Sequence, residues 1–242
     1  MDQGIRLATI SDLKCGECAL GKLCLPVGVN PAQMASLEEI VDAGRVYHEG
    51  ERVYSEGQDF EYVYAVKSGM FKTVLNDGQG SEHIASFHLP GELFGLDALH
   101  QDSHPSSVIA LGTSSLCAIK YSKLERLALQ IPGLQHHLFS VLSKEVQSAH
   151  EKQQEHAADQ KLATFLFTLS ARYKERGYSD TRFNLMMPRR DIANHLNLAP
   201  ETISRLFKRF QRDGLIDVKR TDLQILDLPA LGVLGGCNQM CV

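Results

Sequence analysis

Residues 188–214 of the chain read PRRDIANHLNLAPETISRLFKRFQRDG. Proline is favoured at the first position of a helix, so Pro188 and Pro200 predict the starts of two short helices. Asn197-Leu198-Ala199 forms the turn between them, and Gly214 is placed to end the second helix. One apolar face on each helix would pack the pair together, and it comprises Ile192, Ala193, Leu196, Leu198, Ile203, Leu206 and Phe210.

The opposite face of the second helix is polar and mostly basic. A helix of this kind can enter the major groove of DNA and present its first turns to the base edges. Arginine pairs with the two acceptors of guanine, glutamate accepts from cytosine, and serine tolerates several bases. A helical hairpin with a solvated face is the alternative, but the basic face and short turn favour DNA binding. The expected DNA-contacting residues are Glu201, Thr202, Ser204, Arg205, Lys208 and Arg209.

The overall charge conceals a local asymmetry. The 242 residues carry 25 Lys and Arg against 29 Asp and Glu, a net charge of −4. Residues 186–220 hold eight basic and four acidic residues, so this stretch is +4 and the remainder is −8. A basic segment on an acidic body indicates a local site for a polyanion.

Composition and the N-terminus bear on location. A hydrophobic content of 43% and a charged content of 22% are typical of globular domains. No apolar run approaches the length of a transmembrane helix, and residues 1–6 lack the basic region and apolar core of a secretory signal. We therefore expect a cytoplasmic protein without a membrane partner.

Periodicity changes once along the chain. Short β-type runs separated by Gly, Asp and Asn turns indicate an antiparallel sandwich or barrel over residues 46–122. After Ser122 apolar residues recur every three or four positions, and Pro132-Gly133 separates a short helix from a long one. We expect the long helix to run from Leu134 into Ala158 and either to pack on its own core or to pair with a second copy. The predicted strands are residues 62–66, 71–75, 83–89, 108–111 and 116–121.

Four of the six cysteines form a three-plus-one pattern. Cys15, Cys18 and Cys24 lie within ten residues, and Cys117 is expected at the end of a strand. In a cytosolic protein this grouping favours metal or redox chemistry over a disulfide framework. Four thiolates could bind zinc or an iron–sulfur cluster, and the asymmetric pattern favours iron. Cys237 and Cys241 lie in a glycine-rich tail, and we expect no ligand there.

The second helix of the pair resembles that of the CRP/FNR transcription regulators, and specifically the FNR branch. That branch reads TTGAT-type half-sites through a Glu-x-x-Ser-Arg signature, matched here by Glu201, Ser204 and Arg205. In the cyclic-AMP receptor branch an arginine precedes the glutamate and a glycine replaces the serine, where this chain has Pro200 and Ser204.

The resemblance extends over nearly the whole chain. The cysteine spacing, the Leu-Cys-Leu-Pro of residues 23–26, and residues 64–69 and 90–95 match the FNR-type oxygen sensors. This resemblance implies a 4Fe-4S cluster held by Cys15, Cys18, Cys24 and Cys117. It also implies a homodimer that binds palindromic double-stranded DNA and contacts RNA polymerase. The implied α+β fold has a jelly-roll-like sensor domain, a long dimerisation helix and a winged helix-turn-helix domain. The expected boundaries are 1–30 for the cysteine segment, 31–133 for the sensor, 134–160 for the helix and 161–242 for the DNA-binding domain and tail.

Other functions have less support. Residues 16–22 nearly spell a P-loop, but position 23 is leucine and no strand precedes it, so nucleotide hydrolysis is rejected. Cyclic-nucleotide binding is not expected. Proteins that bind cyclic nucleotides in this family place an arginine after the Gly-Glu-Leu turn to neutralise the cyclic phosphate, whereas here no arginine follows Gly91-Glu92-Leu93 before Arg126. A redox enzyme is disfavoured because the chain has no dinucleotide fingerprint and no nucleophile–base set. A sensor of haem, nitric oxide or another small effector, with incidental cysteines, is the main alternative.

Overall fold

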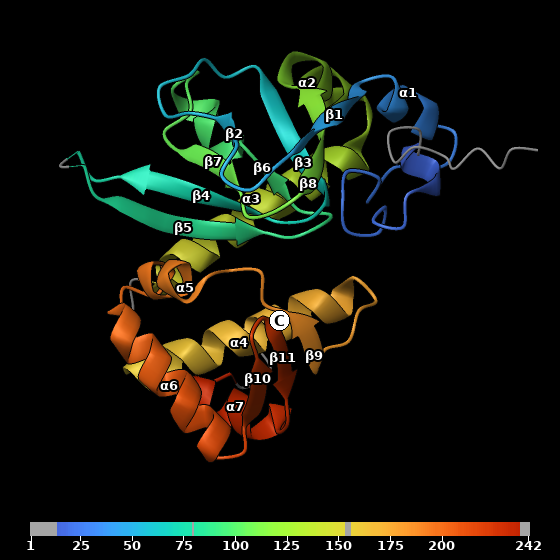
Figure 1. Cartoon of the computed structure of the whole chain (residues 1–242). Helices are drawn as coiled ribbons and strands as arrows, with labels where there is room; N and C mark the ends of the chain where they lie inside the picture. The colour runs from blue at the N-terminus through green and yellow to red at the C-terminus, as the bar shows by residue number, and fades with distance from the viewer. Residues whose placement is uncertain (1–13, 79, 153–155, 238–242) are drawn as a thin grey trace, which may run out of the picture.

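The computed structural model describes residues 14–78, 80–152 and 156–237 (Figure 1). A β domain at the top of Figure 1 is joined by a long helix to a mainly helical domain below it. None of the described helices is long and apolar enough to cross a membrane. The α+β fold class expected from the sequence is confirmed.

The upper domain, called the sensor domain after the role expected from the sequence, consists of two antiparallel four-stranded sheets. One sheet has the order β1-β8-β3-β6 and the other the order β2-β7-β4-β5. All five predicted runs are strands, and three further strands, β1, β2 and β6, had not been predicted. The bounds are β1 Val41–Tyr47, β2 Arg52–Tyr54, β3 Tyr62–Ser68, β4 Phe71–Asn76, β5 Glu82–His88, β6 Leu93–Phe94, β7 Ser107–Ala110 and β8 Ser114–Lys120.

Two apolar cores stabilise the sensor domain. Aromatic and aliphatic side chains of both sheets, among them Phe71, Phe94 and Leu116, fill the space between the sheets. A second core covers the outer face of the β1-β8-β3-β6 sheet with the short helix α1 (Met34–Glu38), the helix α2 (Tyr121–Gln130) and the start of α3 (Pro132–Lys152). Leu25, only 1% exposed, anchors the cysteine segment in this second core.

The long helix differs from the sequence expectation at both ends. It begins at Pro132, where a missing amide hydrogen costs nothing, and its described part ends at Lys152. Ala157 has extended backbone (φ −60°, ψ 151°) and caps a separate helix, α4 (Ala158–Glu175). The expectation of one helix running into Ala158 was therefore wrong. Residues 147–160 offer almost no apolar surface for packing, and tertiary packing rather than propensity stabilises most helices.

The lower domain, called the DNA-binding domain after the role expected from the sequence, holds the predicted helix pair, α5 (Arg189–His195) and α6 (Pro200–Arg212). Pro200 is the first residue of α6 as expected, but Pro188 is the extended cap that precedes α5 and not its first residue. Asn197 makes the turn with a positive φ of 54°, which asparagine tolerates well, and Gly214 follows α6 with a φ of 73°. A three-stranded sheet completes the winged domain, with β9 (Arg182–Asn184), β10 (Ile216–Lys219) and β11 (Asp222–Ile225) in the order β10-β11-β9, followed by α7 (Leu228–Gly235).

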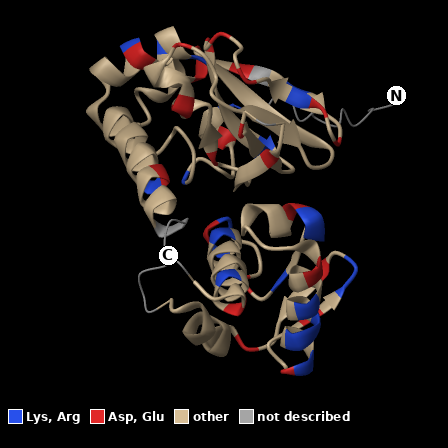
Figure 2. Ribbon diagram, turned by 90° about the vertical axis from the view of Figure 1, so that its left-hand side faces the viewer, with Lys and Arg blue, Asp and Glu red and all other residues tan. Residues whose placement is uncertain are grey.

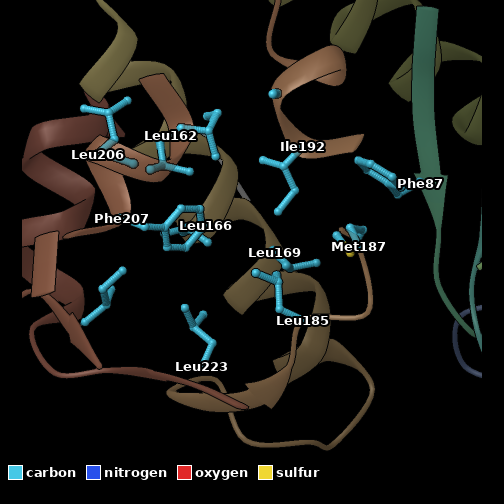
Figure 3. Packing of buried hydrophobic residues seen from close by; sticks show 14 of the residues in the cluster. Phe87, Leu162, Leu166, Leu169, Leu185, Met187, Ile192, Leu206, Phe207 and Leu223 are labelled. Atoms are coloured by element: carbon cyan, nitrogen blue, oxygen red, sulfur yellow. The ribbon is translucent and has the colours of Figure 1, made fainter. Parts of the chain in front are cut away.

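The two domains share one continuous apolar core. Leu162 and Leu166 of α4 pack against Leu206 and Phe207 of α6 (Figure 3). On the other side Phe87 of β5 approaches this core, and α5 lies directly beneath β5 in Figure 1. The sensor sheet β2-β7-β4-β5 therefore serves as the platform on which the DNA-binding domain rests.

Truncating the centre of this core should destabilise the DNA-binding domain strongly. Phe210 of α6 is fully buried, so Phe210→Ala should lower the free energy of unfolding by about 3–5 kcal/mol. Thermal unfolding followed by circular dichroism measures the loss. Tyr178→Ala, which removes a ring that is 55% exposed, is the matched control and should cost far less. An equal loss in both variants would contradict this packing.

Candidate DNA-binding face and cysteine site

The helix α6 presents one polar face to solvent. Its apolar side is turned inward, since Ile203, Leu206, Phe207 and Phe210 are all buried. Of the predicted DNA contacts, four are exposed and two are half-buried. Those exposed are Glu201, Ser204, Arg205 and Lys208, and those half-buried are Thr202 and Arg209.

Local contacts distinguish the polar side chains of α6. The Ser204 hydroxyl donates to the Pro200 carbonyl at 2.9 Å, and the Arg205 guanidinium lies 3.5 Å from the Thr202 hydroxyl. Arg209 is instead engaged within the domain, because its guanidinium donates to Asp159 of α4 at 2.8 Å. Arg205 and Lys208 are thus better placed than Arg209 to contact a ligand in front of the helix.

Arg189 of α5 packs against the buried side of α6. The guanidinium of Arg189 lies 3.3 Å from the centroid of the Phe207 ring. Burial lowers the pKa of Arg189 to about 10, so it stays charged at neutral pH. Figure 2 shows that blue Lys and Arg segments are dense on the helices of the lower domain. The basic stretch of the sequence, residues 186–220, therefore lies in the DNA-binding domain.

Three of the cysteines lie on a segment built from consecutive tight turns. A single 3-10 turn, η2 (Cys15–Glu17), begins it, and the Cys18 amide donates to the Cys15 carbonyl at 3.3 Å. Gly21 then donates to Cys18, and Cys24 donates to Leu20 at 3.1 Å. These turns fold the segment back on itself, so that its three thiols can face one place.

The fourth cysteine joins them from the sheet. Cys117 lies in the middle of β8, opposite Ala65 of β3, and not at the strand end that the sequence indicated. One small cavity is lined by Cys15, Cys18, Cys24 and Cys117 together with apolar residues such as Leu25 and Ile119. The structure therefore brings together all four cysteines that the sequence singled out, although they are separated by up to 102 positions in the chain.

Burial keeps three of these thiols, those of Cys15, Cys24 and Cys117, protonated when nothing is bound. Burial, and then the neighbouring Cys117 and Cys18 thiols, raise the pKa of Cys15 to about 11. Burial raises the pKa of Cys24 to about 12 and also raises that of Cys117. Holding several thiolates together here would require a strongly positive group, as metal centres provide.

The four thiols supply the sulfur ligands that iron–sulfur clusters use. Within residues 14–78, 80–152 and 156–237, no three His, Cys, Asp or Glu side chains are grouped closely enough to hold a single metal ion. In a 4Fe-4S cluster each cysteine binds a different iron atom, so its ligands stand further apart than those of one ion. Four thiols line one cavity together with apolar residues and Lys67, and four is the number of cysteine ligands that such a cluster takes.

Of the two tail cysteines, Cys237 is not among the residues that line this cavity. Cys237 is buried in the DNA-binding domain, at the end of α7. Cys241 lies outside the described residues.

Sequence reasoning missed the residues that join the two domains. Glu92, in the turn before β6, binds Arg172 of α4 and Arg176, the residue that caps the end of α4. Lys72 of β4 binds Asp191 of α5. The spacing of Arg172 and Arg176, four residues apart on one helix face, was the only local signal. Their partner lies 80 or more positions earlier, which no local pattern reveals.

Comparison with known proteins identifies the class of protein. Residues 160–234 match the Crp-like helix-turn-helix domain family, and residues 44–130 match the cyclic nucleotide-binding domain family. The chain is 41% identical to the transcriptional activator protein Anr of Pseudomonas protegens, over 98% of both chains. It is 35% identical to the fumarate and nitrate reduction regulatory protein of Vibrio cholerae, over 94% of this chain and 92% of the other. The structure of FixK2 from Bradyrhizobium japonicum superposes with a TM-score of 0.72 at 27% identity, covering 79% of this chain and 96% of that one.

The fold, the exposed basic face of α6 and these matches define a DNA-binding transcription regulator, not an enzyme. The chain belongs to the CRP/FNR family and is of the FNR type.

Proposed function

We propose that this regulator senses oxygen through a 4Fe-4S cluster held by Cys15, Cys18, Cys24 and Cys117. The observation that carries the proposal is that all four thiols line one cavity, three from the cysteine segment and one from β8. An iron–sulfur cluster would supply oxygen-sensitive chemistry, and the similarity to the fumarate and nitrate reduction regulatory protein supports the proposal.

The residues of this chain would bind the cluster and link it to the fold. The cysteine segment is anchored on one side by Leu25 in the sensor core. Its exit touches the start of the long helix, since a Cβ atom built on Gly28 would lie 2.5 Å from the Gly133 carbonyl oxygen. If the segment moved on loss of the cluster, the first turn of α3 would have to move with it.

We infer that α3 is the dimerisation helix. The proposed domain boundaries remain 1–30, 31–133, 134–160 and 161–242, although α3 itself begins two residues before position 134. Its apolar stripe divides into two parts. Leu134, Leu138 and Val141 pack on the sensor core, whereas Phe139 and Val146 are 61% and 56% exposed. Phe139, Leu142 and Val146 share the spacing of a coiled-coil seam. A seam this short gives a dimer that a change in the cysteine segment could switch.

The proposed dimer would bind palindromic TTGAT-type sites and contact RNA polymerase in anaerobic gene regulation. Two copies of α6 would enter successive major grooves, as helix-turn-helix dimers do. Glu201, Ser204 and Arg205 would read bases, and Thr202, Lys208 and Arg209 would contribute contacts around them.

The dimer should depend on oxygen and on the seam. We expect the anaerobic protein to sediment as a dimer and the air-exposed protein to shift towards monomer at low micromolar concentration. Phe139→Ala should favour monomer in the anaerobic protein, because it removes a large apolar contact from a short seam. Leu129→Ala on α2, which is 74% exposed and off the seam, is the control. Equal dimer fractions with and without oxygen would contradict the proposed switch.

Anaerobic purification with iron and sulfide analysis tests the cofactor itself. We expect about four irons and four sulfides per chain, with a broad absorbance band that fades on brief exposure to air. A sharp Soret band would indicate haem and overturn the cluster. Full DNA binding by a colourless protein would favour a different effector.

A further inference from the structure

The DNA-binding domain is attached to the sensor domain at two separate polar contacts. At the first, the Lys72 ammonium of β4 lies 2.6 Å from Asp191 of α5, whose side chain is only 7% exposed. Beside it, the Asn194 amide pairs with the edge of β5, accepting from the Ile84 amide at 2.6 Å and donating to the Glu82 carbonyl at 2.7 Å. This contact fixes α5 to the sheet.

The second contact is an ion cluster around Glu92. Both carboxylate oxygens of Glu92 accept from Arg172, at 3.0 and 2.6 Å, and one also accepts from Arg176 at 2.5 Å. The Arg176 side chain is 2% exposed. Burial alone would raise the pKa of Glu92, but the charges and hydrogen bonds of the arginines lower it to about 2. Glu92 is therefore ionised at neutral pH.

The arginines also hold the backbone around Glu92. Arg172 donates to the Phe87 carbonyl at 2.6 Å, and Arg176 donates to the Pro90 carbonyl at 2.7 Å. The Glu92 carboxylate accepts from the Leu89 amide at 3.0 Å within the same turn. The turn 89–92 and the last helical turns of α4 thus form one hydrogen-bonded unit.

The other side of this turn touches the cysteine segment. A Cβ atom built on Gly91 would lie 3.0 Å from the Cβ atom of Leu23 and 3.7 Å from that of Leu20. Both leucines lie between Cys18 and Cys24. Gly91 has a φ of 89°, so the backbone of the turn comes closer to the segment than a side chain would allow.

A continuous set of contacts leads from this turn to the recognition helix. Arg172 lies on α4, and Asp159 at the start of α4 binds Arg209 of α6 at 2.8 Å. Leu162 and Leu166 of α4 pack against α6 (Figure 3). Spatial continuity alone does not establish coupling, so the route requires a coupling measurement.

We propose that Glu92 is a positioning residue for DNA binding, which ties α4 to the turn on which the cysteine segment rests and so transmits movement of that segment to α6. This inference rests on the proposed function in one respect, because loss of the proposed cluster is what would move the cysteine segment. The Lys72–Asp191 contact joins the same two domains through α5 and β4, and serves as the matched control.

A double-mutant cycle tests the coupling on the full chain without a cluster. Leu23→Ala removes the Leu23 side chain beyond its Cβ atom, including the Cδ1 atom that lies beside Gly91. Glu92→Gln removes the charge that holds both arginines. Hydrogen exchange of the α4 amides at residues 169–175 is the readout. We expect Leu23→Ala to speed this exchange about five-fold, the low end of typical coupling between sites, and to have no further effect in the Glu92→Gln background. In the Lys72→Gln background the effect of Leu23→Ala should persist.

DNA affinity supplies a second readout. Glu92→Gln should weaken binding to a palindromic TTGAT duplex about five-fold while base preference stays unchanged, since the domain is displaced and its contacts are intact. Exchange in the β10–β11 hairpin verifies that the domain is folded. An effect of Leu23→Ala that is equal in the Glu92→Gln background, or absent in every background, would overturn the proposal. Iron analysis of protein purified separately without oxygen tests the cluster. Absence of iron there, together with a non-additive cycle, would reject the cluster and leave the role of Glu92 supported.

Discussion

The Cys117→Ser protein, purified without oxygen, is expected to retain almost no iron or sulfide. Serine keeps the size of the side chain but replaces a soft thiolate by a hydroxyl, which is a poor ligand for iron. Cys117 is also the ligand that β8 contributes, so its loss would detach the proposed cluster from the sheet. Cys15→Ser, Cys18→Ser and Cys24→Ser should have the same effect.

Cys237→Ser provides the control, because Cys237 lies at the end of α7 in the other domain. It should keep the iron content and the absorbance of the unmodified protein. Full iron retention in Cys117→Ser would rule out the three-plus-one ligand set.

Arg205→Ala is expected to cost about 1–3 kcal/mol per half-site and to relax the preference for the guanine of TTGAT. Arg205 is exposed on the face of α6 opposite the buried Ile203 and Leu206, so its guanidinium is free to reach a base edge. Glu201 lies one turn earlier on the same face. In a symmetric dimer the loss would occur twice.

Lys208→Ala should behave differently, since a lysine beside the groove wall contacts phosphate and not a base. It should weaken all sequences alike and reduce the salt slope by about 1. Anisotropy titrations on single-base variants at two salt concentrations separate the two effects. A uniform loss for Arg205→Ala, together with altered base preference for Lys208→Ala, would mean that α6 docks in another register.

The helix pair could be predicted almost to the residue because its signals are local. Pro200, Asn197 and Gly214 each mark a backbone requirement that the neighbouring residues alone define. The strand β1 escaped prediction because Asp42, Gly44 and Arg45 interrupt its apolar pattern, and only pairing with β8 makes it a strand. Long-range pairing of this kind leaves no periodic trace in the sequence.

In the candidate sites, too, local patterns could be predicted from the sequence and long-range contacts could not. The cysteine pattern singled out four residues that line one cavity in the structure, while their role as ligands stays a prediction. The end of α3 was misjudged because residues 147–160 are good helix formers, and no local stop signal marks the extended Ala157. The Glu92 ion cluster forms only when the two domains dock, so the residues near Arg172 and Arg176 in the sequence do not predict Glu92 as their partner.

The most direct measurement is the affinity of one protein sample for a palindromic TTGAT duplex, by anisotropy titration under nitrogen and again after brief exposure to air. Iron content and dimer fraction are recorded on the same sample. We expect tight, sequence-specific binding under nitrogen and a loss of at least ten-fold after air, in step with the loss of iron. Equal affinity before and after complete loss of iron would contradict control of DNA binding by the cysteine site.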